Sequence, residues 1–258
     1  MSHQPLKIEA SFIRSAASAS DLPRDGLAEL ALVGRSNVGK SSLINALVRQ
    51  RVARTSAAPG KTRLANIYRI VRGAWPPFYL VDLPGYGYAR GGHDAAVEFE
   101  NLTAAYFMRD RQERRDRRDA NHVPALPARP AHPARVSAIL LVDARHPGLE
   151  SDVGAWQWLN ASIARTAIVA TKIDKLARGE RIRAMRELQS VIDKPVLPVS
   201  AVTGEGLDEL WTLIDKLAKP DNPNNRPNSS SLNSSSRLPS SRAATAPAAL
   251  RTRPRPKR

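Results

Sequence analysis

The chain has 258 residues, which is enough for one large domain or two small ones. It has no cysteine, which excludes disulfides and thiolate metal sites, and its five histidines are scattered, so the sequence shows no metal-binding cluster. The formal net charge of +16 indicates a polyanionic partner, either nucleic acid or an acidic membrane surface. The N-terminus has no continuous apolar stretch of the signal-peptide type and no apolar run is long enough to span a bilayer, so we expect a soluble, intracellular protein.

Strands and helices are predicted to alternate along most of the chain. The predicted strands are Ala10–Arg14, Leu30–Val33, Leu64–Val71, Phe78–Val81, Val136–Val142, Ala167–Ala170 and Val196–Val199. The predicted helices are a first one ending near Arg49, then Asp94–Arg111, Asp152–Ala161, Glu180–Ile192 and Gly206–Leu217. This alternation predicts an α/β fold with a mostly parallel, doubly wound sheet and helices on both faces.

Composition divides the chain into three parts: an N-terminal extension over 1–25, one domain over 26–218 and a tail over 219–258. Within the domain, Val123–Arg135 is rich in Pro and Ala and is predicted to be an exposed loop. The run Arg109–Asp119 mixes six Arg with four acids, so a solvated helix end is a better interpretation than an RNA grip. The tail has no apolar periodicity and is predicted to be disordered; its nine Lys or Arg and one Asp give it a net charge of +8.

A glycine loop between the second strand and the first helix has the pattern of a phosphate-binding P-loop. Its residues are Gly34, Arg35, Ser36, Asn37, Val38, Gly39, Lys40 and Ser41. The two glycines let backbone N–H groups converge on an anion, and the positive end of the helix adds to that field. Lys40 is expected to reach the β- and γ-phosphates, and the Ser41 hydroxyl to bind Mg²⁺. The alternative, a glycine turn that only caps a helix, fits the flanking strand and helix less well.

Two further segments have the features of nucleotide-sensing switches. The first comprises Gly60, Lys61, Thr62, Arg63 and Leu64, in which Thr62 is a candidate second hydroxyl for Mg²⁺ or, alternatively, a plain surface threonine. The second comprises Asp82, Leu83, Pro84 and Gly85 at the end of a strand, where P-loop proteins hold the Mg²⁺ shell. Gly85 has no side chain, so its N–H can approach the γ-phosphate. Lys40, Thr62 and Gly85 are therefore the candidate catalytic residues.

Guanine is the base that the remaining motifs predict. Thr171, Lys172, Ile173 and Asp174 follow one strand, and Val199, Ser200 and Ala201 end the next. The Asp174 carboxylate can accept hydrogen bonds from N1–H and the 2-amino group of guanine, whereas adenine offers an acceptor at N1. The stem of Lys172 can cover the base face, and backbone N–H groups near Ser200 can reach guanine O6. The expected ligands are GTP and GDP.

These motifs together resemble the EngB family of bacterial GTPases, in the Era- and TrmE-like branch. The resemblance covers about Leu27 to Leu217 and includes Asp82-Leu-Pro-Gly-Tyr-Gly-Tyr-Ala89 and Asp143-Ala-Arg-His-Pro147. It implies a P-loop GTPase fold, Mg²⁺ bound by Ser41 and Thr62, and a cytoplasmic GTPase that assists assembly of the large ribosomal subunit through its rRNA. Family members are also associated with cell division and septation. We expect no membrane partner and a monomer. Relative to the family pattern, residues 111–135 look like an insertion and the tail over 219–258 looks like an addition.

The resemblance also bears on how hydrolysis is catalysed. Ras-type GTPases have a glutamine immediately after the switch glycine, but Tyr86 stands there in this chain. No arginine finger is identifiable, with Arg35 and Arg90 left open, so slow intrinsic hydrolysis is expected. In TrmE-like relatives an asparagine at the Asn37 position helps to hold K⁺; alternatively, Asn37 only tolerates the loop conformation.

Three hypotheses follow for function. The favoured one is a ribosome-assembly GTPase. The second is a GTPase that acts directly on division or the membrane, and the third is a nucleotide-dependent binding module with negligible turnover.

Overall fold

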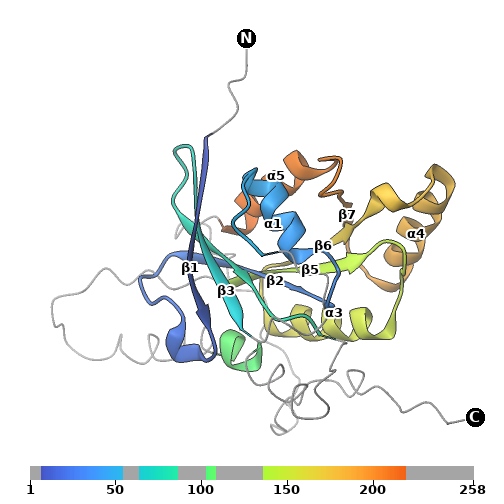
Figure 1. The fold of residues 1–258 in the computed structure, drawn as a ribbon. Coiled ribbons are helices and arrows are strands. Elements are labelled where there is room, and N and C mark those ends of the chain that lie inside the picture. Colours follow the sequence, from blue (N-terminus) through green and yellow to red (C-terminus); the bar gives the residue numbers. More distant parts are fainter. Residues whose placement is uncertain (1–6, 55–63, 87–102, 109–135, 219–258) are drawn as a thin grey trace, which may run out of the picture.

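The computed structural model describes residues 7–54, 64–86, 103–108 and 136–218 (Figure 1). The predicted tail, the 111–135 insertion and most of the first switch segment lie outside these residues. So does most of the predicted Asp94–Arg111 helix, of which residues 103–108 are described and helical. The described residues comprise the sheet, its covering helices and the segments that border the P-loop.

A seven-stranded sheet forms the centre of the described chain. From edge to edge its strands are β1 (Ile8–Ala16), β3 (Ala65–Arg72), β4 (Phe78–Asp82), β2 (Ala28–Gly34), β5 (Val136–Asp143), β6 (Thr166–Thr171) and β7 (Val196–Pro198). The pairings from β4 to β7 are parallel, whereas β3 is antiparallel to both β1 and β4. The predicted mostly parallel sheet is thus confirmed.

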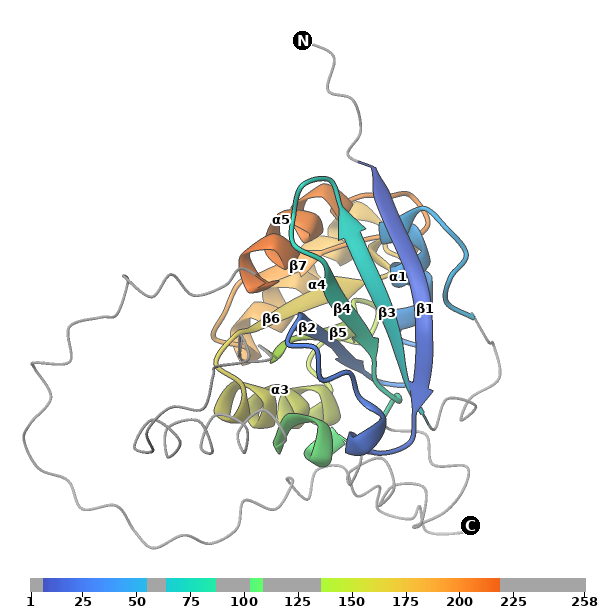
Figure 2. The same cartoon turned by 90° about the vertical axis from the view of Figure 1, so that its left-hand side faces the viewer.

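The antiparallel corner follows from chain connectivity. Only a short turn links β3 to β4, and such a link permits an antiparallel neighbour but no parallel crossover. The first strand is longer than predicted and pairs with β3 along its whole length, with an irregularity between Phe12 and Arg14. Figure 2 views the sheet from this β1 edge.

Helices cover both faces of the sheet, as the doubly wound prediction requires (Figures 1 and 2). They are α1 (Lys40–Val48), α3 (Glu150–Ser162), α4 (Arg178–Val191) and α5 (Leu207–Ala218). Buried side chains of α1 and α5 belong to one hydrophobic cluster, and those of α3, α4 and the 103–108 helix belong to the other. No helix in the described part of the chain is long and apolar enough to cross a membrane.

Strand β5 shows why the two cores form on opposite faces. All eight of its residues are buried, as is typical of a parallel strand covered on both sides. Because successive side chains of a strand point to opposite faces, Leu140 and Val142 join the α3 cluster while Ile139 and Leu141 join the α1 cluster. The parallel strands all end at the same edge, so the segments that follow them meet there.

Candidate nucleotide-binding site

The P-loop connects the end of β2 to the start of α1, as predicted. A side chain at Gly34 would place its Cβ 2.8 Å from the Leu141 carbonyl oxygen, so only glycine fits beside β5. Gly39 has φ +110° and precedes α1, and Asn37 has φ +62°. These left-handed residues fold the loop back over the first turn of the helix, the shape that directs backbone N–H groups toward an anion.

The Lys40 side chain is buried and extends back to the first two residues of this loop. Its Nζ donates to the carbonyl oxygens of Gly34 at 3.2 Å and Arg35 at 3.4 Å. Burial lowers the pKa of Lys40, and the nearby charge of Asp82 opposes that shift. The ammonium group is therefore already positioned over the loop, where phosphate oxygens are better partners than backbone carbonyls.

Asp82 and Ser41 lie together near Lys40. The Ser41 hydroxyl donates to Asp82 Oδ2 at 3.1 Å, and Asp82 is 2 % exposed. Burial raises the pKa of Asp82, and Lys40 and Ser41 act in the opposite direction. Asp82 Oδ1 is buried and has no hydrogen-bond partner among the described residues.

A carboxylate oxygen left without a partner in a buried site is costly. A hard cation with hydroxyl, water and phosphate ligands would satisfy it, and Mg²⁺ has this preference. The described residues contain no cluster of three or more His, Cys, Asp or Glu that could hold a metal by itself. Ser41 and Asp82 thus fit Mg²⁺ that also binds phosphates; the other predicted metal ligand, Thr62, lies outside the described residues, together with Gly60, Lys61 and Arg63. Leu64 is described and 40 % exposed, and its role in the site stays a prediction.

The second switch segment lies directly on the P-loop. Leu83 donates its N–H to the Leu32 carbonyl, and Leu83 and Pro84 are both buried. The Ser36 hydroxyl donates to the Gly85 carbonyl at 3.2 Å. A Cβ on Gly85 would lie 2.6 Å from Ser36 N, so this close approach requires glycine. Gly85 is thereby brought to the edge of the loop that ends in Lys40 and Ser41.

The predicted base-reading residues meet at the ends of β6 and β7. The Thr171 hydroxyl donates to the Val38 carbonyl at 2.7 Å and so ties β6 to the P-loop. The Ile173 N–H donates to Val199 O, and the Ser200 hydroxyl donates to Asp174 Oδ1 at 2.7 Å. Partial burial alone would raise the pKa of Asp174. The hydrogen bonds from Ser200 and Lys175 outweigh this effect and hold the pKa below its usual value. An ionised Asp174 suits the two N–H donors of guanine. Ala201 follows Ser200 and is half-buried.

Lys172 adopts φ +61°, a conformation that is uncommon for a lysine. Its Nζ donates to the Asn37 carbonyl oxygen and to Asp143 Oδ2, the latter at 2.9 Å. The stem therefore extends past Gly39, where an added Cβ would lie 3.8 Å from Lys172 Cε. This path runs between the predicted base-reading residues and the P-loop, and the role of Lys172 as a cover for the base stays a prediction.

Two acidic residues near the site had no predicted role. Asp143 ends β5 and accepts hydrogen bonds from both Lys172 and Arg145. Partial burial alone would raise the pKa of Asp143, but these contacts hold it well below the usual range. Its place at a strand end, within a motif that carries the family resemblance, was the available signal. Asp152 contacts Arg35 and Tyr86 from the first turn of α3, and no local pattern indicates it. Arg35 is thus engaged by Asp152, and Arg90 lies outside the described residues.

Comparison with known proteins identifies the family to which these motifs belong. Residues 29–172 match the model of the 50S ribosome-binding GTPase family. The chain is 37 % identical to a "Probable GTP-binding protein EngB" of Heliobacterium modesticaldum, over 80 % of this chain and 91 % of that one. It is also 37 % identical to a protein of the same name in Clostridioides difficile, over 81 % and 93 % of the two chains.

Among solved structures, Aquifex aeolicus Era bound to GDP·AlF₄⁻ superposes with a TM-score of 0.58 and 20 % identity, over 76 % of this chain and 58 % of that one. Era in complex with MgGDPNP and nucleotides of 16S ribosomal RNA gives 0.54 and 20 %, over 79 % and 61 %. These likenesses confirm the P-loop GTPase fold. The family match and the sequence relatives show that this chain belongs to the EngB family of GTP-binding proteins.

Proposed function

We propose that this chain hydrolyses GTP to GDP and phosphate with Mg²⁺, and that it acts as a switch in the assembly of the large ribosomal subunit in the cytoplasm. Normal cell division and septation would depend on that role. The observation that carries the proposal is the meeting of three segments at one edge of the sheet: the P-loop, Asp82–Gly85 and Thr171–Asp174. Each supplies a group that a guanine nucleotide requires.

Each segment has its own task in this proposal. Lys40 binds the β- and γ-phosphates, Ser41 and Asp82 hold the magnesium shell, and Asp174 binds guanine. Mg²⁺, when bound, neutralises phosphate charge. Gly85 offers its N–H to the γ-phosphate, which makes the second switch segment the sensor that distinguishes GTP from GDP. Thr62 is proposed as the matching sensor in the first switch segment.

The proposed intrinsic rate is slow because Tyr86 is poorly placed to orient water. Its side chain is 3 % exposed and its hydroxyl donates to Asp152 at 2.8 Å. A partner or a cation beside the phosphates would then complete the site, and K⁺ held through Asn37 is one proposal. The positive φ of Asn37 equally supports the simpler view that this residue only suits the loop.

Charge and family support a ribosomal partner. The matched family is described as ribosome-binding, and the solved Era complex contains ribosomal RNA. Helix α4 contains four arginines among its fourteen residues. Arg181 pairs with Glu205, whereas Arg178, Arg183 and Arg186 make no ion pair with any described residue. Arginines on an exposed helix, without ion pairs to the described residues, suit a phosphate backbone.

Co-sedimentation with purified ribosomal subunits tests the proposal. The full chain is mixed with 50S or 30S subunits in the presence of GDP or a non-hydrolysable GTP analogue, and pelleted protein is measured. We expect pelleting with 50S subunits and the GTP analogue, and much less with GDP or 30S subunits. Pelleting that is independent of nucleotide, or absent with 50S subunits, would contradict the proposal.

A further inference from the structure

Asp152 joins two segments of the nucleotide site that are far apart in sequence. Arg35 Nε donates to Asp152 Oδ1 at 3.0 Å and to Oδ2 at 3.2 Å. The Tyr86 hydroxyl donates to Asp152 Oδ1 at 2.8 Å. One carboxylate on α3 therefore binds both the second residue of the P-loop and the residue that follows the switch glycine.

The cluster of Arg35, Tyr86 and Asp152 is largely buried, and the start of α3 stabilises its carboxylate. Asp152 is 2 % exposed, and the Arg35 side chain is 21 % exposed. Asp152 lies in the first turn of α3, where the positive helix end favours a carboxylate. Burial raises the pKa of Asp152, with Tyr86 and Arg35 acting in the opposite direction.

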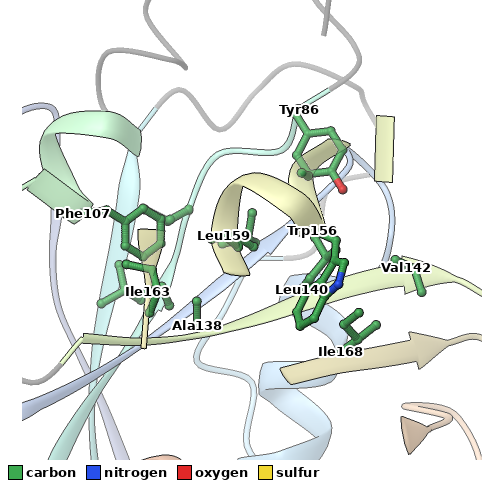
Figure 3. Close-up of a cluster of buried hydrophobic side chains, with 14 of the residues drawn as sticks. Tyr86, Phe107, Ala138, Leu140, Val142, Trp156, Leu159, Ile163 and Ile168 are labelled. Atoms are coloured by element: carbon green, nitrogen blue, oxygen red, sulfur yellow. The ribbon is translucent and has the colours of Figure 1, made fainter. Parts of the chain in front are cut away.

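The Tyr86 ring lies in the hydrophobic cluster that α3 forms with the sheet (Figure 3). Trp156 and Leu140 belong to the same cluster. The ring is therefore held by packing and the hydroxyl by Asp152. Loss of the hydroxyl alone would leave the packing intact, which makes the hydrogen bond experimentally separable.

The backbone beside this cluster forms a short bridge. Arg35 and Tyr86 are paired in parallel, and the Ser36 N–H donates to the Tyr86 carbonyl at 3.0 Å. Gly85 precedes Tyr86 and contacts Ser36. Holding the side chains of Arg35 and Tyr86 on one carboxylate therefore holds the Gly85 N–H at the edge of the P-loop.

We propose that Asp152 is a positioning residue that holds Gly85 ready for the γ-phosphate and so sets the preference of the site for GTP over GDP. This inference rests on the proposed function, because it assumes that Gly85 contacts a γ-phosphate. GDP lacks that phosphate, so its binding does not depend on where Gly85 lies. If the contacts of Asp152 with Arg35 and Tyr86 are weakened, Gly85 must be ordered when GTP binds, and that entropy cost lowers the affinity for GTP but not for GDP.

The test compares two nucleotides on single substitutions. Tyr86→Phe removes the hydroxyl and keeps the ring, and Asp152→Asn keeps the shape but removes the charge. Tyr79→Phe is the matched control, because the Tyr79 hydroxyl also donates to an aspartate, Asp25, at 2.6 Å, and its ring is 6 % exposed on β4. Affinities for GDP and for a non-hydrolysable GTP analogue are measured by titration, alongside the melting temperature.

Tyr86→Phe and Asp152→Asn are each expected to weaken the GTP analogue about tenfold, within the range typical of coupling between sites. GDP affinity should change less than about twofold, and Tyr79→Phe should change neither affinity. The inference would be overturned if both nucleotides lost affinity equally, or if neither variant changed either affinity. It would also be overturned if Tyr79→Phe weakened the GTP analogue selectively. A wild-type chain that binds neither nucleotide would instead refute the proposed function.

Discussion

Replacing Asp174 with asparagine should exchange the base preference of the site. The carboxylate is 9 % exposed, and Oδ1 already accepts a hydrogen bond from Ser200. An asparagine can keep that bond through its own oxygen, so local geometry is retained. Its amide N–H₂, however, meets the N–H donors of guanine, whereas xanthine has a carbonyl at C2 that can accept from it.

The magnitude follows from the bonds that are lost. Two charge-assisted hydrogen bonds of about 1.5–3 kcal/mol each place the loss at about 3–6 kcal/mol, or roughly two to four decades in GTP affinity. Stability should change little. The only ion pair in the described residues that Asp174 loses is with Lys175, which is 57 % exposed, and such surface pairs contribute about 0–1 kcal/mol.

The assay is titration of wild type and Asp174→Asn with GTP and with xanthosine triphosphate. Lys175→Gln serves as the matched control, because it removes the ion pair and keeps the carboxylate. The control should bind GTP like the wild type, and Asp174→Asn should lose GTP and gain xanthosine triphosphate. GTP affinity that is unchanged in Asp174→Asn would show that another residue reads the base.

Three further predictions concern the cation and the basic surfaces. If Asn37 helps to hold K⁺, wild-type hydrolysis should be faster in K⁺ than in Na⁺ at equal ionic strength, and Asn37→Gly, which tolerates φ +62°, should erase the difference; equal wild-type rates would assign Asn37 to the loop shape alone. If the tail contacts rRNA, deleting residues 219–258 should reduce the slope of log affinity for 50S subunits against log salt by about three, at roughly 0.7 per phosphate for four or five contacts, whereas an unchanged slope would exclude a role for the tail. Replacing Arg178, Arg183 and Arg186 on α4 with serine should reduce the same slope by about two and leave hydrolysis without subunits unaffected, and a loss of that hydrolysis would argue against a pure docking role.

Most of the fold could be predicted because its signals are local. The buried runs of β2 and β5 and the glycines of the P-loop carry their structural meaning within a few residues. The position of Asp82 at the end of β4 and that of Asp174 just after β6 then followed from the parallel sheet. The full length of β1 and its pairing with β3 could not be predicted, because an exposed edge strand lacks a continuous pattern of buried residues.

The contacts that organise the site were harder to predict because they join distant residues. Arg35 and Asp152 are 117 positions apart, and Lys172 reaches Asn37 over 135. A charged residue in the first turn of a helix usually faces solvent, so Asp152 resembled an ordinary surface acid. Only the packing of α3 against the sheet brings its carboxylate to the P-loop.

The most direct test of a ribosome-dependent GTPase is phosphate release measured with purified subunits. The full chain is incubated with GTP and Mg²⁺ alone, with 30S subunits and with 50S subunits, at equal concentrations. We expect slow release by the chain alone, little change with 30S subunits and clear acceleration with 50S subunits. Release that is equal in all three mixtures, or absent in all, would contradict a ribosome-dependent GTPase.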